Sequence, residues 1–139
     1  MEGREGLAAA CLLALAACQA AGPEVTPTFS GIAADERVHF TGTEPFWGGE
    51  VANGEALYRT PENVEGERFA VSRFAGNNGV SFTGTLAGEA FDMMVTPGTC
   101  SDGMSDRSYP YTVTVEHGGR RLDGCGWTDR KRFTGPAAS

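Results

Sequence analysis

The chain has 139 residues, of which 40% are hydrophobic and 21% are charged, and these values are typical of one globular domain rather than of a disordered chain. It carries 18 acidic and 11 basic residues, for a formal charge of −7. This acidity argues against nucleic-acid binding, which depends on lysine and arginine to neutralise phosphates, and we expect no nucleic acid as a partner.

The first predicted element, residues 1–17, is an export signal rather than a part of the fold. Arg4 gives it a weakly basic start, and an uninterrupted run of 11 small and apolar residues follows over 7–17. Such a run is typical of the apolar region of a signal peptide and is shorter than the roughly 20 residues of a membrane span. We therefore expect residues 1–17 to be removed on export.

The residues around Cys18 indicate a lipid anchor. Leu15, Ala16 and Ala17 precede this cysteine in an arrangement that resembles a lipobox, so we expect cleavage before Cys18 and acylation of the cysteine. Acyl chains contribute about 0.8 kcal/mol per buried CH₂, and several of them hold a protein stably on a membrane. Gln19 follows, where Asp would favour the inner membrane, so we expect the outer membrane with the body facing the periplasm. The alternative is an ordinary secretory signal cleaved at an Ala-x-Ala site.

Three further regions follow the signal. Residues 18–32 contain proline and small residues and predict a flexible tether. Residues 33–132 carry the patterned sequence and predict the folded domain. Residues 133–139 end in Gly-Pro-Ala-Ala-Ser and predict a loose tail.

Alternation of apolar and polar residues with a period of two dominates the predicted domain and indicates β-strands. Asn and Gly in the gaps favour hairpin turns because they accept positive φ. We predict an all-β fold, a single small antiparallel β-barrel of about eight short strands, because closure removes exposed strand edges. A two-sheet sandwich is the alternative. In chain order, the predicted strands span 38–41, 46–51, 56–60, 69–74, 80–86, 91–96, 109–116 and 121–127.

Once the signal is removed and Cys18 is acylated, two further cysteines remain, Cys100 and Cys125. In an exported chain we expect them to form a disulfide, and closing a loop of roughly 26 residues would stabilise the domain by about 3–4 kcal/mol. A metal site or a thiol nucleophile is the alternative. His39 and His117 show no close spacing to either cysteine, so we expect no metal and no cofactor.

The first motif, Gly-Thr-Glu-Pro-Phe-Trp, spans residues 42–47. Phe46 and Trp47 are neighbours in a predicted strand and must point to opposite faces. We expect one ring to pack in the core and the other to lie at a rim, where it could serve a function beside Glu44.

The second motif, residues 100–111, reads Cys-Ser-Asp-Gly-Met-Ser-Asp-Arg-Ser-Tyr-Pro-Tyr. Asp102 begins a turn signal, and its side chain can accept hydrogen bonds from backbone N–H groups of the turn. Arg107 can pair with Asp106 or another carboxylate. The spacing of oxygen ligands does not match a calcium-binding EF-hand. The functional alternative is a recognition surface that comprises Glu44, Phe46, Trp47, Asp102, Asp106, Arg107 and Tyr109.

Both motifs, together with the later Gly124-Cys125, resemble a family of uncharacterised bacterial envelope lipoproteins. Members of that family share a TEPFW start, a CSDGMSDxxYPY centre and a GC close. The resemblance covers about residues 40–127, and the family is loosely related to small β-barrel lipoproteins of the META type. It implies a barrel fold and an envelope location, and it brings no established activity.

Three classes of function remain open to the sequence. The first is a lipid-anchored binding or interaction module, whose partner is another envelope protein or a small apolar ligand. The second is a protein inhibitor of an envelope hydrolase such as lysozyme, because an acidic surface suits a basic enzyme. The third is an enzyme, for which Glu44 and Asp102 are the candidate acid–base residues. No spacing marks them as a pair, so we expect no catalytic activity.

Overall fold

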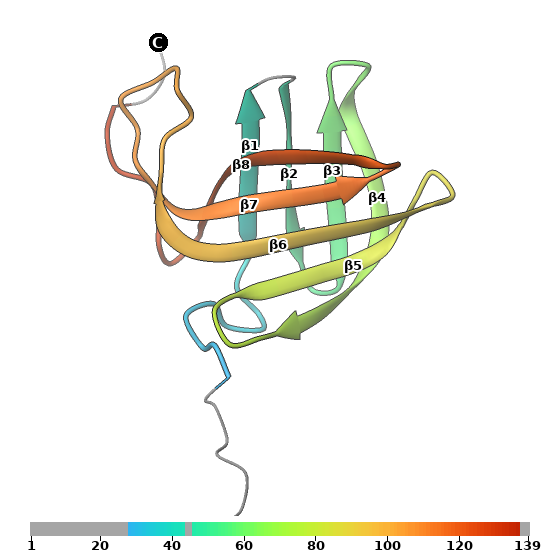
Figure 1. Cartoon of the computed structure of the whole chain (residues 1–139), viewed down its shortest axis with the longest axis horizontal. Helices are drawn as coiled ribbons and strands as arrows, with labels where there is room; N and C mark the ends of the chain where they lie inside the picture. Colours follow the sequence, from blue (N-terminus) through green and yellow to red (C-terminus); the bar gives the residue numbers. More distant parts are fainter. Residues whose placement is uncertain (1–27, 44–45, 137–139) are drawn as a thin grey trace, which may run out of the picture.

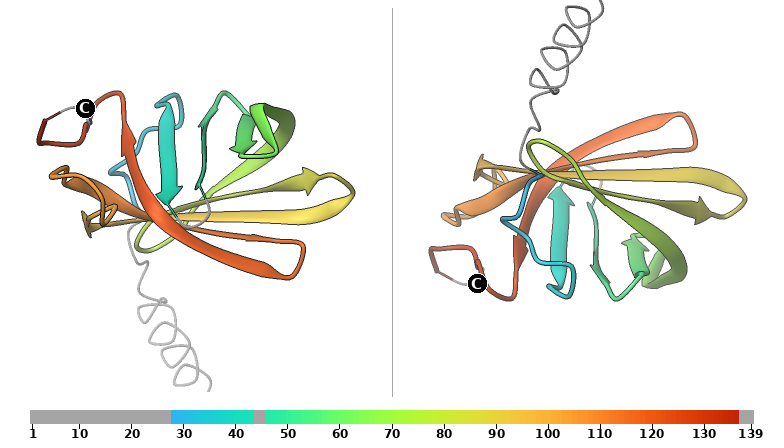
Figure 2. Two further views of the ribbon diagram at one scale, coloured as in Figure 1. Left: turned by 90° about the horizontal axis from the view of Figure 1, so that it is seen from above. Right: turned by 90° about the horizontal axis from the view of Figure 1, so that it is seen from below.

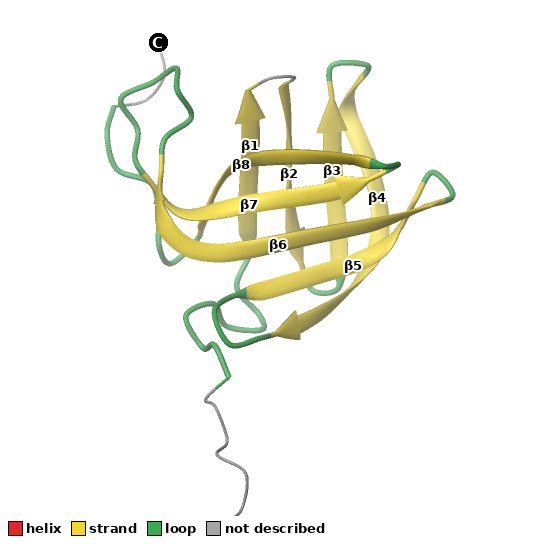
Figure 3. Ribbon diagram, viewed as in Figure 1, coloured by secondary structure: helices red, strands yellow, loops and turns green. Residues whose placement is uncertain are grey.

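The computed structural model describes residues 28–43 and 46–136 of the chain. Within these ranges every regular element is a β-strand, which confirms the all-β prediction (Figure 3). No helix in the described ranges is long and apolar enough to cross a membrane. The strands are β1 (Val38–Thr43), β2 (Phe46–Ala52), β3 (Glu55–Thr60), β4 (Asn63–Ala75), β5 (Val80–Leu86), β6 (Glu89–Cys100), β7 (Tyr109–His117) and β8 (Arg120–Thr128).

The sheet closes into a barrel. Each strand pairs antiparallel with the next, and β8 pairs back onto β1, which confirms the predicted eight-stranded barrel over the sandwich. The strands β1 to β3 cross β5 to β8 steeply, as Figures 1 and 2 show from three directions. β4 joins the two halves, because residues 63–70 pair with β3 and residues 71–75 pair with β5. A strand that serves two sheets forms the corner of such an orthogonal packing.

The barrel core follows directly from the alternation in the sequence. Along β7, Tyr111, Val113 and Val115 are each at most 2% exposed, whereas Thr112 and Thr114 between them are partly exposed. Because successive side chains of a strand point to opposite faces, the apolar residues of β7 lie inside the barrel.

Aromatic rings continue the core through the barrel. Ring centroids lie 5.9 Å apart for Phe40 and Trp47, 6.3 Å for Trp47 and Tyr58, and 5.6 Å for Tyr58 and Phe91. These separations are typical of packed aromatic pairs. Side chains therefore fill this part of the interior, as they do in other barrels of eight strands.

The adjacent aromatics of the first motif separate as predicted. Trp47 is 4% exposed and belongs to the core, while Phe46 is 60% exposed. The indole of Trp47 occupies space that side chains at Gly42 and Gly124 would need, since a Cβ at either position would collide with the ring. These two glycines therefore allow the large ring to pack between β1 and β8.

Two hairpin turns use the left-handed backbone region. Asn53 and Gly54 join β2 to β3 with φ values of 53° and 77°, as the Asn-Gly pair predicts. Ala87 and Gly88 join β5 to β6 with φ values of 53° and 80°. An alanine in this region carries backbone strain, because its Cβ crowds the following carbonyl.

The folded body begins earlier than the sequence indicated. Ile32, assigned to the tether, is 1% exposed and lies in the core. The backbone N–H of Phe29 donates to the carbonyl oxygen of Gly76 at 2.7 Å, and Tyr111 donates from its hydroxyl to Gly31 at 3.5 Å. Residues 29–32 therefore pack against one end of the barrel, where Ile32 lies in the core and Phe29 packs against it.

The body also ends later than the sequence indicated. Phe133, placed at the start of a loose tail, packs against Trp127 with ring centroids 5.4 Å apart. Ser108 and Thr134 exchange two backbone hydrogen bonds of 2.9 Å each. The described part of the tail therefore lies against residues 101–108, the segment that carries the second motif.

Candidate functional site

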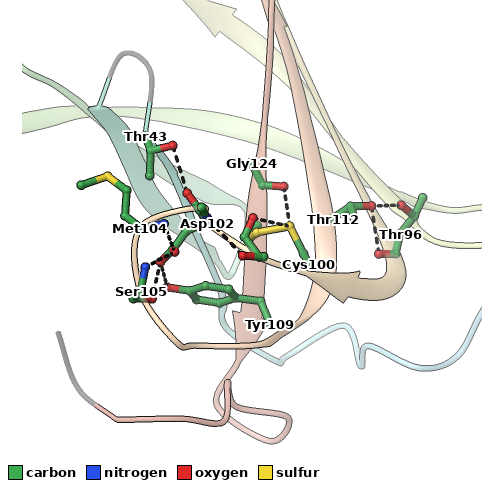
Figure 4. The surroundings of a disulfide bond; sticks show 12 residues. Thr43, Thr96, Cys100, Asp102, Met104, Ser105, Tyr109, Thr112 and Gly124 are labelled. Atoms are coloured by element: carbon green, nitrogen blue, oxygen red, sulfur yellow. Dashed lines mark hydrogen bonds between the residues drawn. A yellow bond between two sulfur atoms is a disulfide. The ribbon is translucent and has the colours of Figure 1, made fainter.

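The two sequence motifs, although far apart in the chain, lie side by side in the fold. We call residues 101–108, between β6 and β7, the motif loop. The hydroxyl of Thr43, at the end of β1, donates to the carbonyl oxygen of Asp102 at 3.3 Å (Figure 4). A groove of about 650 Å³, here the motif groove, lies between this loop and Phe46. Its lining residues are Thr41, Gly42, Thr43, Phe46, Asp102, Met104, Ser105, Asp106, Arg107, Tyr109 and Pro136.

A disulfide fixes the base of the motif loop. Cys100 and Cys125 are bonded, which confirms the predicted pair, and their Cα atoms lie 5.6 Å apart. The bond joins the end of β6 to β8, across the intervening strand β7 (Figure 4). The loop is therefore held covalently where it leaves the sheet.

Asp102 organises the motif loop from within. Its Oδ1 accepts hydrogen bonds from the backbone N–H of Ser105 at 2.8 Å and of Met104 at 2.9 Å. Its Oδ2 accepts from the Ser105 hydroxyl at 2.7 Å and from the Tyr109 hydroxyl at 3.1 Å. The bond from the Ser105 N–H contributes most, and together these bonds lower the pKa of Asp102 from 3.8 to about 2. The carboxylate is thus a structural acceptor that stays ionised at neutral pH.

A second aromatic cluster supports the motif loop outside the barrel core. Tyr109 is 2% exposed, and its ring centroid lies 5.5 Å from those of both Trp127 and Phe133. Burial raises the pKa of Tyr109 above its usual value, so its hydroxyl stays protonated and can donate to Asp102.

Arg107 joins this cluster rather than pairing with Asp106. Its guanidinium carbon lies 4.2 Å above the ring of Phe133, and its Nε donates to the carbonyl oxygen of Pro136 at 3.2 Å. A guanidinium over an aromatic ring is attracted by the ring quadrupole. The charge of Arg107 therefore holds the C-terminal segment against the motif loop and leaves the Asp106 carboxylate exposed.

The structure brings most of the predicted recognition residues together. The motif groove contains Phe46, Asp102, Asp106, Arg107 and Tyr109, whereas Trp47 is in the core. Glu44 and the predicted lipidation site Cys18 lie outside the described residues.

Six lining residues of this groove were not among the predicted recognition residues, and two of them matter most for a partner. Met104 is 68% exposed, and Thr43 connects the two motifs. An apolar residue alone in a polar loop was the signal for Met104, since such a side chain either packs under the loop or faces a partner.

A second groove adjoins the first. It measures about 490 Å³, crosses the outer face of β1, β2 and β3, and shares Thr41, Gly42 and Phe46 with the motif groove. At its far side, His39 stacks on Trp127 with ring centroids 5.2 Å apart and lies 2.8 Å from a carboxylate oxygen of Asp129. The ring of Phe46 therefore stands between two grooves and can contact an occupant of either.

Comparison with protein-family models, with curated proteins and with solved structures found no match. The resemblance to envelope lipoproteins thus depends on the sequence motifs alone. Within residues 28–43 and 46–136, no three or more His, Cys, Asp or Glu side chains are grouped so that they could hold a metal ion.

Proposed function

We propose that this protein is a lipid-anchored interaction module of the bacterial cell envelope, which binds a protein partner through the motif groove. One observation carries the proposal: residues of both motifs line the same groove. Two large apolar side chains in it, Phe46 and Met104, are 60% and 68% exposed. Large apolar side chains exposed in a fixed, concave surface are typical of sites that a partner covers. The disulfide and the hydrogen bonds of Asp102 reduce the entropy lost on binding, because the loop is already ordered.

The position of the groove supports a partner in the periplasm. Residues 28–32 lie at the lower end of the barrel in Figure 1, whereas the motif loop and the start of β2 lie at the upper end. A lipid on Cys18 would hold the lower end near the membrane, since residues 19–27 span at most about 35 Å. The motif groove lies at the end of the barrel opposite the point where this tether would enter.

A protein inhibitor of an envelope hydrolase such as lysozyme is the second candidate. The exposed carboxylate of Asp106 lies in the same groove as Phe46 and Met104, and the chain has a formal charge of −7. A basic enzyme would be steered toward such a surface. In this case the purified chain inhibits lysozyme, and Asp106→Asn weakens inhibition most at low salt. Absence of inhibition removes this candidate and leaves the first proposal standing.

Two methionines allow a controlled test in the native envelope. Met104 lies in the motif groove, and Met94 is an exposed methionine, 48% accessible, on β6 outside it. We expect Met104→Asp to release the full chain from its complex in detergent-extracted envelopes, and Met94→Asp to leave the complex intact, as judged by its size on a native gel. Equal behaviour of the two variants would contradict the proposal.

A further inference from the structure

The two ends of the barrel differ. Residues 29–32 pack against the end near the start of β7, where the Tyr111 hydroxyl donates to the Gly31 carbonyl oxygen and Ile32 lies in the core. His117, at the other end of β7, borders a pocket of about 250 Å³. We call it the mouth pocket. Its walls come from β3 and β4 and from the β5–β6 and β7–β8 hairpins, and they include Tyr58, Glu67, Leu86, His117, Arg120 and Leu122.

The mouth pocket has an apolar floor beneath a charged rim. Tyr58 and Leu86 are 7% and 4% exposed, and Leu122 packs against the same core. Glu67 and Arg120 are exposed at the rim. Binding sites for small molecules typically combine an apolar lining with a few polar groups that fix orientation, and the mouths of barrels are a common place for them.

Both charges of the rim share the mouth pocket with Tyr58. Glu67 is the direct β-sheet neighbour of Tyr58. Burial raises the pKa of Tyr58, and the positive charge of Arg120, which lines the same pocket, opposes that rise. Among the ion pairs of the described residues, none involves Glu67 or Arg120. Within the described part of the chain, a ligand at either charge would therefore displace no ion pair.

The pocket wall is held in place without those two residues. Nε2 of His117 lies 2.8 Å from the carbonyl oxygen of Leu86, which joins the end of β7 to the end of β5. The ring of His117 also packs against the buried ring of Phe91, with centroids 6.1 Å apart. These contacts do not involve Glu67 or Arg120, so replacing either charged residue should leave the pocket wall folded.

We propose that the mouth pocket binds a small zwitterion with an apolar body. A ligand carboxylate faces Arg120, its ammonium group faces Glu67, and its apolar side chain enters toward Tyr58 and Leu86. A volume of about 250 Å³ equals roughly eight water molecules in the liquid, which suits a ligand the size of one apolar amino acid. A free amino acid and a short apolar peptide share this chemistry. The mouth pocket has no residue in common with the motif groove, so this proposal is independent of the proposed function.

Four probes separate the parts of the proposal. L-leucine, leucyl-alanine, N-acetyl-leucine and leucinamide are titrated into the full chain, exported and purified, while the amide resonances of Leu86, Ala87 and His117 are followed by NMR. We expect saturable binding of leucine or of the dipeptide. The one that binds more tightly shows whether the ligand is a free amino acid or a short apolar peptide. N-acetyl-leucine lacks the cation and leucinamide lacks the anion, so each should bind about tenfold more weakly. Absence of saturation for all four at about 10 mM, or equal affinity for all, would overturn the proposal.

Neighbouring residues provide matched variants. Arg120→Gln should weaken leucine about tenfold without changing leucinamide, while Arg121→Gln, which lies outside the pocket and pairs with Asp123 at 3.5 Å, should change neither. Glu67→Gln should weaken leucine without changing N-acetyl-leucine, and Glu65→Gln should have no effect. A loss as large in Arg121→Gln or Glu65→Gln would show that general charge, and not the mouth pocket, attracts the ligand.

Discussion

Replacing Asp102 with alanine tests whether one carboxylate holds the motif loop. The change removes the acceptor of four hydrogen bonds, from the N–H groups of Met104 and Ser105 and the hydroxyls of Ser105 and Tyr109. A pKa lowered from 3.8 to about 2 corresponds to at most about 2.4 kcal/mol of unfolding free energy at neutral pH. The carboxylate is partly exposed to solvent, which screens these bonds, so we expect a loss of about 1 kcal/mol.

Asp106 provides the control within the same loop. It is exposed, and no side-chain hydrogen bond or ion pair of Asp106 occurs among the described residues, so we expect Asp106→Ala to change the unfolding free energy by less than about 0.5 kcal/mol. Urea unfolding followed by tryptophan fluorescence measures both variants, because Trp47 is buried in the core. Equal stability of the two variants at pH 7 would refute the structural role of Asp102.

The dependence on pH gives the same prediction an independent check. The folded-state pKa of Asp102 is depressed, so its contribution to stability is fully present above about pH 5 and is lost as the pH falls toward 2. The wild-type chain and Asp102→Ala should therefore differ at pH 6 and converge near pH 2. A difference that stays constant down to pH 2 would show that the mutation acts by some means other than removing the charge.

Three further changes have predicted effects on stability. Gly42→Ala places a methyl group against the indole of Trp47, so we expect a loss of about 2 kcal/mol in urea unfolding and a red-shifted emission; an unchanged spectrum would contradict the packing. Replacing Cys100 and Cys125 by serine should cost about 3 kcal/mol and speed amide exchange in the motif loop, as NMR would detect, and unaltered exchange would mean that the disulfide does not hold it. Ala87→Asn should raise stability by about 1 kcal/mol, seen as a higher Tm, because asparagine tolerates the positive φ at this turn; a lower Tm would argue against that strain.

The barrel could be predicted because most strands bury one face. Where apolar and polar residues alternate, as along β5 and β7, the sequence predicts the strand almost to its ends. β4 begins at Asn63, well before its predicted start at residue 69, because its first residues are exposed on both faces and show no alternation. Backbone pairing with β3 makes that part a strand, and pairing is a property of the fold rather than of the segment.

Single apolar residues at the two ends of the domain were placed wrongly for a related reason. Ile32 and Phe133 each lie in a segment with few large apolar residues, so local composition indicated a tether and a tail. Ile32 is held by core side chains distant in the sequence, and Phe133 is held by Tyr109, 24 residues away, together with Trp127. Such contacts have no local signal.

The candidate site was predicted as a list of residues rather than as a place. The adjacent rings of Phe46 and Trp47 had to face opposite ways, but the sequence did not indicate which one was exposed. The glycines that accept the indole, Gly42 and Gly124, lie on β1 and β8, and they become neighbours of the ring only when the barrel closes. The same closure brings Thr43 to Asp102 and so creates the motif groove.

Site-specific photo-crosslinking tests the central claim, that the motif groove binds a protein partner, most directly. A photoreactive phenylalanine analogue replaces Phe46 in one strain and Phe74 in another, since both rings are well exposed, at 60% and 68%, and only Phe46 lies in the groove. After irradiation of living cells, the account predicts a discrete protein adduct of the full chain from position 46 and none from position 74. No adduct from position 46, or the same adducts from both positions, would contradict it.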